Sequence, residues 1–315
     1  MADQSSPTVS VIIPAYNAAA FIVDTLASVY AQTFGDFEVI VVNDGSPDTD
    51  ALEQALGRYP TKLRYLKQAN QGAAAARNTG ICAASGEFVA FLDADDTWLP
   101  SFLERQVDVL KRESADVVWA DALICGESPL AGRTFMQVQP SFAEVTPENL
   151  LSVKVTVLTS TVVARRERVL EVGLFDTKLR RGQDFELWLR LARGGARFVY
   201  QPEVLAQRRI VESSLSGSAL SQLERTLTVL DAIQAKGNLT PGEEEALQWN
   251  LRRTHRELAV EMGKEKLRGR DFQGALGSFR EAGQFRQSWK LVLVCLGLRA
   301  APELLWRIYQ RRASG

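Results

Sequence analysis

The feature that most constrains this chain is an apolar run that ends in acidic residues, within the segment FVAFLDADDTWLP at residues 88–100. Five of the six residues 88–93 are apolar, which predicts a buried strand of a parallel sheet. Asp93, Asp95 and Asp96 follow at its end, where clustered like charges indicate a bound cation. Carboxylates suit hard divalent cations, and such sites typically bind substrate phosphates. The alternative is an acidic turn that caps the following helix, which is how we interpret Asp96.

The length and composition predict a folded protein with one large domain and a smaller one. Of 315 residues, 46% are hydrophobic and 24% are charged, and a formal net charge of −1 gives no support to a nucleic-acid binder. Cys82, Cys125 and Cys295 lack any metal or redox spacing, so we expect no disulfide framework and a reducing, cytoplasmic compartment. The first ten residues do not resemble a signal peptide, and the apolar stretch 291–298 is too short to span a membrane.

Strands and helices alternate through the first hundred residues, which argues for an α/β fold with a parallel, doubly wound sheet. Such sheets bind ligands at the carboxyl ends of their strands. The runs that predict strands are 8–15, 37–42, 63–66 and 88–93, and those that predict helices are 21–30, 49–58 and a segment from 71. Further along we expect a helix at 102–112, a strand at 116–123 ending near Asp121, a long surface loop at 126–147, a strand at 161–164, a helix at 167–172 and a helix that begins at Asp184.

From residue 218 onward the pattern is helical only, so we predict a first domain at 1–217 and a helical C-terminal extension at 218–315. One stretch fits half of a tetratricopeptide unit, through Gly263, Asp271, Phe272, Ala275, Leu276, Phe279 and Ala282. The segment 286–312 holds six basic residues and one acid around an apolar centre. It could lie on the inner face of an anionic membrane or contact a protein, and a packed helix with solvated arginines is an equal alternative.

Five segments together resemble the family 2 glycosyltransferases, which are inverting enzymes with a nucleotide-sugar donor. The resemblance covers about residues 8–217 and implies the GT-A fold, a Rossmann-like mixed sheet flanked by helices. It also implies a hexosyltransferase-type activity in cell-envelope or exopolysaccharide synthesis, with a nucleoside-diphosphate sugar such as a UDP sugar as donor and a glycan, a lipid-linked or another hydroxyl acceptor. The segments are VSVIIPAYN (9–17), VVNDGS (41–46), NQGAAAARNTGI (70–81), FLDADDTWLP (91–100) and GLFDTKLRRGQDFELWLRLARGG (173–195).

The resemblance implies a nucleotide-sugar site formed by four of these segments. Asp44 would accept hydrogen bonds from a uracil-type base, and Tyr16 would offer a face for that base. Gly72 would allow close approach of the backbone, although tight helix–sheet packing by Gly72 and the alanines after it is at least an equal explanation. Arg77 would contact the nucleotide. The nucleotide-sugar site as a whole would comprise Pro14, Ala15, Tyr16, Asn17, Asp44, Gly72, Arg77, Asp93, Ala94 and Asp95.

The acidic segment resembles the family's DxD motif. Asp93 would lie near the ribose and Asp95 would bind Mg²⁺ or Mn²⁺, which bridges the diphosphate. Many relatives place a histidine soon after a pair that matches Arg208 and Arg209, and this chain does not. Metal coordination would then depend on Asp95, diphosphate and water, and one of the two arginines could contact the diphosphate.

Asp184 is the catalytic base that the resemblance implies, since inversion needs one group to deprotonate the acceptor hydroxyl. The single histidine, His255, lies in the helical extension. The family usually has Glu-Asp at this position, whereas this chain has Gln183-Asp184. Trp188 could form an apolar wall for the acceptor sugar, with core packing as the alternative, and for Trp98 we favour the core.

Other functions fit these residues less well. A sugar-nucleotide pyrophosphorylase would need a Gly-rich phosphate loop after the first strand, where Pro14–Asn17 stands instead. A dinucleotide-dependent dehydrogenase would need G-x-G-x-x-G, and a glycosidase would leave the nucleotide-site residues without a role. A degenerate nucleotide-sugar-binding protein that assembles through its helical tail remains an alternative.

Overall fold

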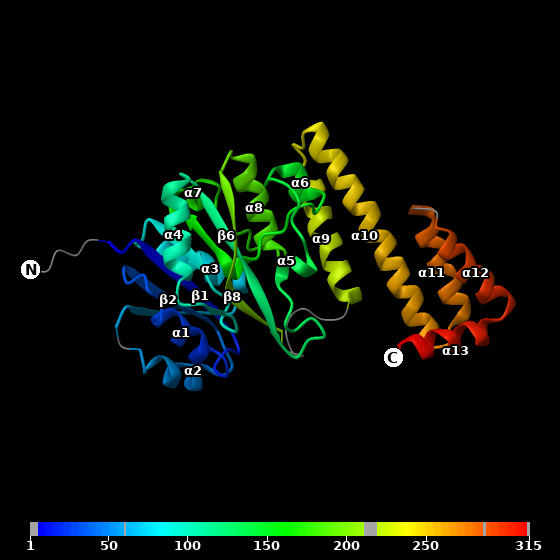
Figure 1. The fold of residues 1–315 in the computed structure, drawn as a ribbon, viewed down its shortest axis with the longest axis horizontal. Helices are drawn as coiled ribbons and strands as arrows, with labels where there is room; N and C mark the ends of the chain where they lie inside the picture. Colours follow the sequence, from blue (N-terminus) through cyan, green and yellow to red (C-terminus); the bar gives the residue numbers. More distant parts are fainter. Residues whose placement is uncertain (1–5, 60, 211–218, 286–287, 314–315) are drawn as a thin grey trace, which may run out of the picture. The chain divides into compact units, whose positions relative to one another are not determined.

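The computed structural model describes residues 6–59, 61–210, 219–285 and 288–313. The chain divides into two compact units, Met1–Glu212 and Ser213–Gly315, which are described in turn. The predicted boundary between residues 217 and 218 lies outside the described residues. Figure 1 traces both units in sequence colours.

Within the described residues of the first unit, eight strands form one sheet, in the order β3-β2-β1-β4-β7-β6-β8-β5. The strands are β1 (Val9–Ala15), β2 (Phe37–Asp44), β3 (Leu63–Gln68), β4 (Phe88–Phe91), β5 (Thr97–Trp98), β6 (Val117–Gly126), β7 (Val162–Arg165) and β8 (Phe198–Ile210). Strands β1 to β4 pair in parallel, as the alternation of strands and helices predicts. Because β7 runs antiparallel to β4 and β6, and β5 runs antiparallel to β8, the sheet is mixed.

Helices cover both faces of this sheet (Figure 1). They are α1 (Ile22–Tyr30), α2 (Thr49–Leu56), α3 (Ala73–Ala83), α4 (Phe102–Arg112), α5 (Phe135–Val138), α6 (Pro147–Leu151), α7 (Arg166–Glu171) and α8 (Gln183–Arg193). Successive side chains of a strand point to opposite faces. In β1, Val11 and Ile13 therefore join α1, α2 and α4 in one apolar cluster, whereas Ile12 joins α3, α6 and α8 in another.

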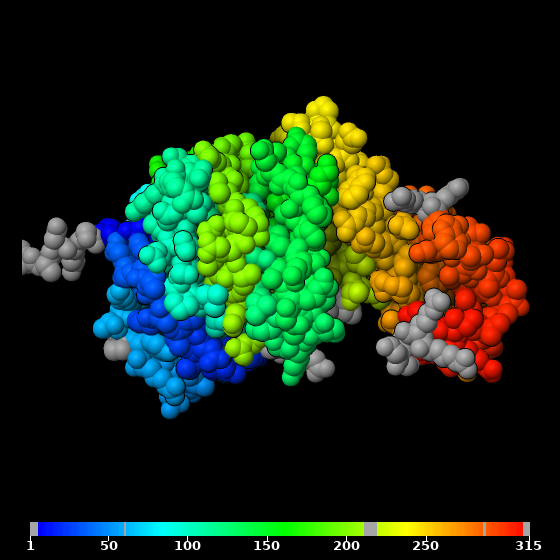
Figure 2. Space-filling model, in the orientation of Figure 1, coloured from blue at the N-terminus to red at the C-terminus, as the bar shows by residue number. Residues whose placement is uncertain are grey.

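The region that we predicted as a long loop, 126–147, contains a short helix, and the strand before it is longer than expected. β6 continues beyond Asp121 to Gly126 because its backbone pairs with β8, with an irregular register around Asp121. The helix α5 is capped by Thr134, whose side chain accepts the Gln137 N–H. Four residues are too few to give a periodic pattern, so the sequence did not predict it. The segment from β6 to α6, coloured green, covers much of the face seen in Figure 2.

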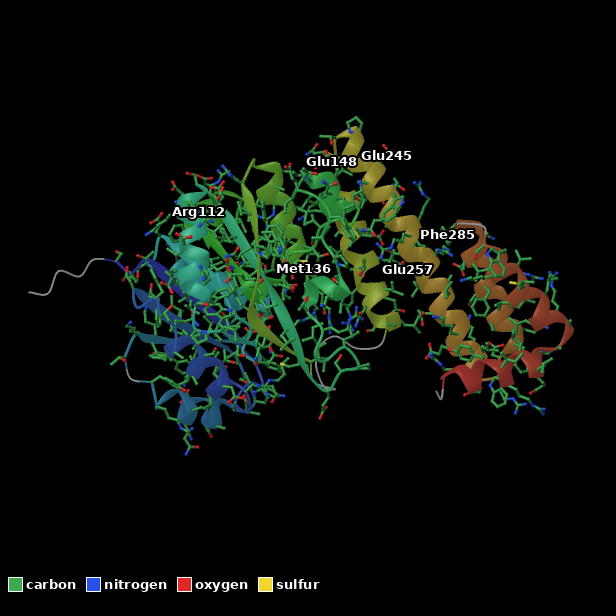
Figure 3. All side chains as sticks on the ribbon, in the orientation of Figure 1. Arg112, Met136, Glu148, Glu245, Glu257 and Phe285 are labelled. Atoms are coloured by element: carbon green, nitrogen blue, oxygen red, sulfur yellow. The ribbon has the colours of Figure 1, made fainter. Side chains whose placement is uncertain are left out.

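The described part of the second unit is helical, with α9 (Ala219–Lys236), α10 (Pro241–Arg268), α11 (Phe272–Phe285), α12 (Trp289–Ala300) and α13 (Pro302–Ala313). The tetratricopeptide-like spacing falls on α10 and α11. Gly263 lies so close to Phe279 that an added Cβ would be 2.8 Å from the ring. At the end of α11, Phe285 (labelled in Figure 3) stacks on His255 with ring centroids 5.6 Å apart. The histidine therefore packs within this unit.

Candidate active site

The sheet brings together the segments that the sequence singled out. The carboxyl ends of β1, β2 and β4 lie at one edge because the three strands are parallel and adjacent. β7 runs the opposite way, so the turn that precedes it, Thr159–Thr161, lies at this same edge. β6 and β8 run parallel to each other and antiparallel to β7, which places the end of β8 there as well.

The loops after β1 and β2 are tied to each other. Ala15 is opposite Asn43 in the ladder, and the backbone N–H of Asn17 donates to Ser46 Oγ over 2.6 Å. Pro14 and Ala15 are the last two residues of β1. Tyr16, which follows them, is 55% exposed. An exposed aromatic ring at a strand end is available for stacking on a planar ligand.

Asp44 holds the loop that leads into α3. Its buried carboxylate accepts hydrogen bonds from Gln68 Nε2 (2.7 Å), the Gln71 N–H (2.9 Å) and the Gly72 N–H (2.7 Å). Gly72 has φ of 90°, and a Cβ there would meet no atom within 4 Å. A glycine is therefore favoured by its backbone conformation. The packing alternative is wrong for Gly72, but the alanines that follow it, Ala74–Ala76, are buried as that alternative expects. The contact of Gln68 with Asp44 could not be predicted from the sequence, because it arises from the pairing of β3 with β2.

The Asp93 carboxylate forms an ion pair with Arg77 of α3, with Arg77 Nη2 2.5 Å from Asp93 Oδ1. The Arg77 side chain is 7% exposed and lies over the Phe175 ring, 5.5 Å from its centroid. Its buried Nε has no hydrogen-bond partner among the described residues. Asp93 is 40% exposed, so the ion pair leaves part of its carboxylate accessible. Between the acids, the Ala94 carbonyl accepts the Thr25 hydroxyl over 2.8 Å.

Asp96 does not cap the following helix, which corrects the sequence prediction. The N-terminal residue flanking α4 is Ser101, and Asp96 is 4% exposed. One oxygen of Asp96, Oδ1, accepts the backbone N–H of Arg209 over 2.8 Å. Arg209 also donates to the Asp95 carbonyl (3.2 Å) and pairs with Asp24 (3.0 Å). The end of β8 therefore closes around the acidic turn, and this tertiary contact overrides the local preference of Asp for a cap.

The acidic turn carries more negative charge than its surroundings balance. Burial raises the pKa of Asp95 from its ordinary value of 3.8 to about 6, the Asp93 charge adds to this, and Arg208 and Arg209 oppose it. Burial and the charges of Asp95 and Asp93 raise the pKa of Asp96 to about 8. A cation at this turn would lower these pKa values by stabilising the ionised forms. In the described part of the chain, no group of three His, Cys, Asp or Glu side chains is arranged to hold a metal.

Asp184 lies in the first turn of α8, where the helix dipole favours a negative charge. Its Oδ2 accepts the Thr159 hydroxyl over 2.9 Å, and its Oδ1 accepts the Phe185 N–H over 2.8 Å. The preceding residue, Gln183, is buried, and its Oε1 has no hydrogen-bond partner among the described residues. A neutral amide costs less to bury there than the usual glutamate would.

The turn Thr159–Thr161 connects Asp184 with the acidic turn. Thr159 donates to Asp184, and Ser160 Oγ accepts the Asp93 N–H over 3.3 Å. The Ser160 carbonyl accepts Trp98 Nε1 over 2.7 Å. Thr159 and Ser160 were not predicted from the sequence, since a short polar turn before a strand has no distinctive pattern. Only the pairing of β7 with β4 brings it to this edge.

Two tryptophans of the sequence analysis belong to the core. Trp98 is 3% exposed and stacks on Phe102 with centroids 4.1 Å apart, as we favoured. Trp188 is 1% exposed and packs against Phe91 and Phe175, with centroids 6.2 and 6.4 Å away. In this structure the Trp188 ring is thus enclosed in the apolar cluster beneath α8. We therefore do not retain it as a wall for an acceptor.

Comparison with known proteins identifies the family of this site. The model of the glycosyl transferase family 2 matches residues 10–174. The amylovoran biosynthesis glycosyltransferase AmsB of Erwinia amylovora is 31% identical over 71% of this chain and 77% of its own length. The putative teichuronic acid biosynthesis glycosyltransferase TuaG of Bacillus subtilis is also 31% identical, over 72% of this chain and 89% of its own length. The chain belongs to the glycosyl transferase family 2, as the motifs predicted.

Solved structures show the same fold. The mannosyltransferase PcManGT of Pyrobaculum calidifontis, in complex with GDP-Man and Mn²⁺, superimposes with a TM-score of 0.65 at 22% identity, over 97% of this chain and 84% of that one. TarS of S. aureus in complex with UDP gives a TM-score of 0.57 at 19% identity, over 98% and 91%. The predicted GT-A fold, a mixed sheet flanked by helices with a helical C-terminal region, is confirmed.

Relatives also differ from this chain in extent. The chain spans about a third of the length of uncharacterised glycosyltransferases from Rickettsia conorii and Rickettsia felis, 31% and 32% respectively. In the part of the chain that the structure describes, no helix has the length and apolar content needed to cross a membrane.

Proposed function

We propose that this chain is an inverting glycosyltransferase that moves a sugar from a nucleoside diphosphate, UDP being the first to test, to a hydroxyl group of a glycan or lipid-linked acceptor. The observation that carries the proposal is the connection between two acidic centres through Thr159 and Ser160. The acidic turn at Asp93–Asp96 is suited to bind a diphosphate with its cation. Asp184 is suited to accept a proton from the acceptor hydroxyl. The names of AmsB and TuaG support a role in cell-envelope polysaccharide synthesis, and the cysteine usage supports a cytoplasmic site.

The donor nucleotide would bind across the ends of β1, β2 and β4. The exposed Tyr16 ring would stack on the base. Asp44 Oδ2 accepts only the Gly72 N–H among the described groups, which leaves a lone pair for a base N–H. Asp93 would contact the ribose, and Arg77 would act through Asp93 by holding its carboxylate in place. The structures of relatives with UDP, UDP-GlcNAc and GDP-Man support a nucleotide-sugar donor.

Asp95 would hold a divalent cation, Mg²⁺ or Mn²⁺. A cation there would offset the burial and the Asp93 charge that raise the pKa of Asp95. Diphosphate and water would complete its coordination, because no three acidic, His or Cys side chains of the described residues are arranged to hold a metal. When bound, the cation would offset negative charge on the diphosphate leaving group. PcManGT, which was solved with Mn²⁺, supports this choice.

Asp184 would remove the proton from the acceptor hydroxyl as its oxygen forms the new bond to the sugar carbon. The bond between that carbon and the phosphate oxygen breaks on the opposite face, so the configuration inverts. The proton passes to Asp184, and the electron pair leaves with the nucleoside diphosphate. Thr159 would position Asp184, because its hydroxyl already occupies one lone pair of Oδ2.

A thermal-shift screen of nucleotide sugars, with and without Mn²⁺, tests donor binding, and release of nucleoside diphosphate tests transfer. We expect one class of nucleotide sugar to raise the melting temperature in a metal-dependent manner and to be turned over when an acceptor is present. Donor binding without release, across a panel of hydroxyl acceptors, would favour the nucleotide-sugar-binding alternative. No binding of any nucleotide sugar would contradict both.

A further inference from the structure

The helix α12 of the second unit is apolar on two opposite sides, and the described residues cover only one of them. Its sequence is WKLVLVCLGLRA. Leu291, Val294 and Leu298 pack in an apolar cluster with α11 and the end of α10. A surface helix of a globular protein normally has one apolar side, which faces the core, and a polar side opposite to it. The uncovered side of α12 therefore requires an explanation.

This uncovered side is a continuous apolar face. Trp289 is 69% exposed, Val292 55%, Leu293 56% and Leu296 52%. Their spacing of i, i+3, i+4 and i+7 places all four on the same side of the helix. We call these four residues the α12 face. Single exposed apolar side chains are ordinary, but a contiguous group of large ones indicates an interaction surface.

Basic side chains lie on both flanks of the α12 face. At about 100° per residue, Lys290 lies about 100° to one side of Trp289 and Arg299 about 80° to the other. Both side chains are exposed, and α12 contains no acidic residue. The exposed side of α12 is thus an apolar stripe with one basic residue on each flank, an arrangement found on helices that lie in the interface of an anionic membrane.

Together, α12 and the following helix, α13, carry a net positive charge. Residues 289–313 contain five basic residues and one acid, Glu303. Arg270 of the preceding α10–α11 turn neutralises that acid, with Arg270 Nη2 2.6 Å from Glu303 Oε1. On α13, Leu304 is 59% exposed and Ile308 45%, which adds apolar side chains one turn apart.

We infer that the α12 face docks on the surface of an anionic phospholipid bilayer, with the helix axis parallel to the membrane and Lys290 and Arg299 directed to the lipid phosphates. The one-sided sign of the charge favours lipid over a protein partner, because the rim of a protein interface is polar and generally carries both signs. Twelve residues are enough to lie on a bilayer and too few to cross one. Docking would bring the chain to lipid-linked acceptors, although the surface itself is independent of the proposed function.

Vesicle flotation of the full chain tests the inference directly. We expect the protein to float with vesicles of phosphatidylglycerol and phosphatidylcholine at low salt, and not with vesicles of phosphatidylcholine alone. Raising the salt concentration should release it, since exposed charges are screened. Failure to float with the anionic vesicles, or equal flotation with both kinds, would overturn the inference. The assay needs neither donor nor acceptor, so its failure would leave the proposed function intact.

Matched variants assign the binding to the α12 face. Leu293→Glu should reduce vesicle binding by at least about tenfold, because it removes apolar burial at the centre of the face. Lys290→Glu should reduce it by more than about fivefold, since each basic residue near an anionic surface contributes attraction of that order. Trp289→Ala should also weaken binding. The controls on α10, Trp249→Ala and Arg252→Glu, change exposed residues of the same types and should bind as the unchanged protein does.

Two further measurements keep the test decisive. Circular dichroism and melting temperature show whether each variant is folded. The salt and lipid dependence is measured on the unchanged protein, so it tests the inference even if a variant fails to fold. Sedimentation velocity without lipid would reveal an oligomer. If Leu293→Glu dissociates such an oligomer, a second copy of the chain covers the α12 face and the membrane inference is wrong. If the controls weaken vesicle binding as much as the α12 variants do, the inference is also wrong.

Discussion

Two acidic centres lie at one edge of the sheet, and they differ in how their charge is balanced. At the end of β4, three carboxylates lie within four positions. Burial and the Asp93 charge raise the pKa of Asp95, and burial and the charges of Asp95 and Asp93 raise the pKa of Asp96. At the start of α8, Asp184 accepts hydrogen bonds from a hydroxyl and a backbone N–H, and it lies at the positive end of the helix dipole. In the first arrangement the nearby arginines do not offset the burial and like charge that disfavour the ionised forms of Asp95 and Asp96, whereas the second is stabilised as it stands.

This difference assigns the two centres to different halves of the proposed reaction. A turn whose ionised carboxylates are disfavoured would be stabilised by a cation with its diphosphate, so it belongs with the donor. A stabilised, partly accessible carboxylate can accept a proton from a hydroxyl group, so it belongs with the acceptor. Substitutions at each centre should therefore affect different measurements, and the predictions below test whether the two are separable.

Asp184→Asn should give the largest effect. Transfer should fall by about 10²–10⁴-fold, the usual contribution of a general base, while donor affinity stays near normal because the acidic turn is unchanged. Steady-state release of nucleoside diphosphate and calorimetric donor binding measure the two effects. Asp108→Asn is the control, since its carboxylate pairs with Arg112 on α4. Loss of donor binding in Asp184→Asn would show that the two centres are not separable.

Asp95→Ala should affect the acidic turn and therefore donor binding. We expect the Mn²⁺-dependent part of nucleotide affinity to disappear, while the metal-independent part remains. Calorimetry with UDP in the presence of Mn²⁺ and of a chelator measures both parts, with Asp108→Ala as the control. An unchanged response to metal in Asp95→Ala would place the cation elsewhere.

The stability of the metal-free protein should depend on pH through the acidic turn. The folded-state pKa values of about 6 for Asp95 and about 8 for Asp96 lie above the ordinary value of 3.8, so the folded state binds more protons than the unfolded state between these limits. The free energy of unfolding should therefore fall as pH rises from about 4 to 8, by at least about 1 kcal/mol. Urea unfolding with a chelator measures this slope.

Two comparisons sharpen the pH prediction. Asp96→Asn should flatten the slope, because the amide keeps an acceptor for the Arg209 N–H and has no charge to bury. Asp184→Asn should leave the slope largely unchanged if the centres are independent. Added Mn²⁺ should raise stability more at pH 8 than at pH 5, since it favours the ionised carboxylates. A metal-free stability that rises across this range would contradict the electrostatic account.

Thr159→Val should give the smallest effect. Loss of one hydrogen bond to a charged group is worth about 1–3 kcal/mol, so we expect the transfer rate to fall by roughly 5- to 100-fold with little change in donor affinity. Thr159→Ser restores the hydroxyl and should recover most of the rate. A positioning role also predicts that the pH profile of transfer shifts in Thr159→Val. Equal losses in the Val and Ser variants, with an unchanged profile, would indicate packing alone.

Much of this architecture could be predicted because the signals are local. The apolar runs of β1, β2 and β4 and the polar residues at their ends predicted a parallel sheet, and Asp44, Asp93 and Asp95 lie at its carboxyl edge as that pattern implies. The helix that carries Asp184 was predicted from its own spacing. Burial pattern and backbone preference act over a few residues, so a single sequence is sufficient to reveal them.

The missed or mistaken residues all depend on partners far along the chain. The position of Asp96 in the sequence is typical of a helix cap, but its carboxylate accepts the backbone N–H of Arg209, 113 positions away. Trp188 has the sequence of a possible ligand-binding residue, but Phe91 and Phe175 enclose it. Thr159 became visible only through its bond to Asp184.

The sequence by itself therefore determined the α/β class, the family, the acidic turn and the position of the proposed base. The tertiary structure decided how the charges of that turn are balanced, which groups bind the two oxygens of Asp184, and which side of α12 the described residues leave exposed. The physical reason is that strand and helix patterns follow from short-range geometry, whereas burial, pKa and exposure depend on atoms that only the fold brings together.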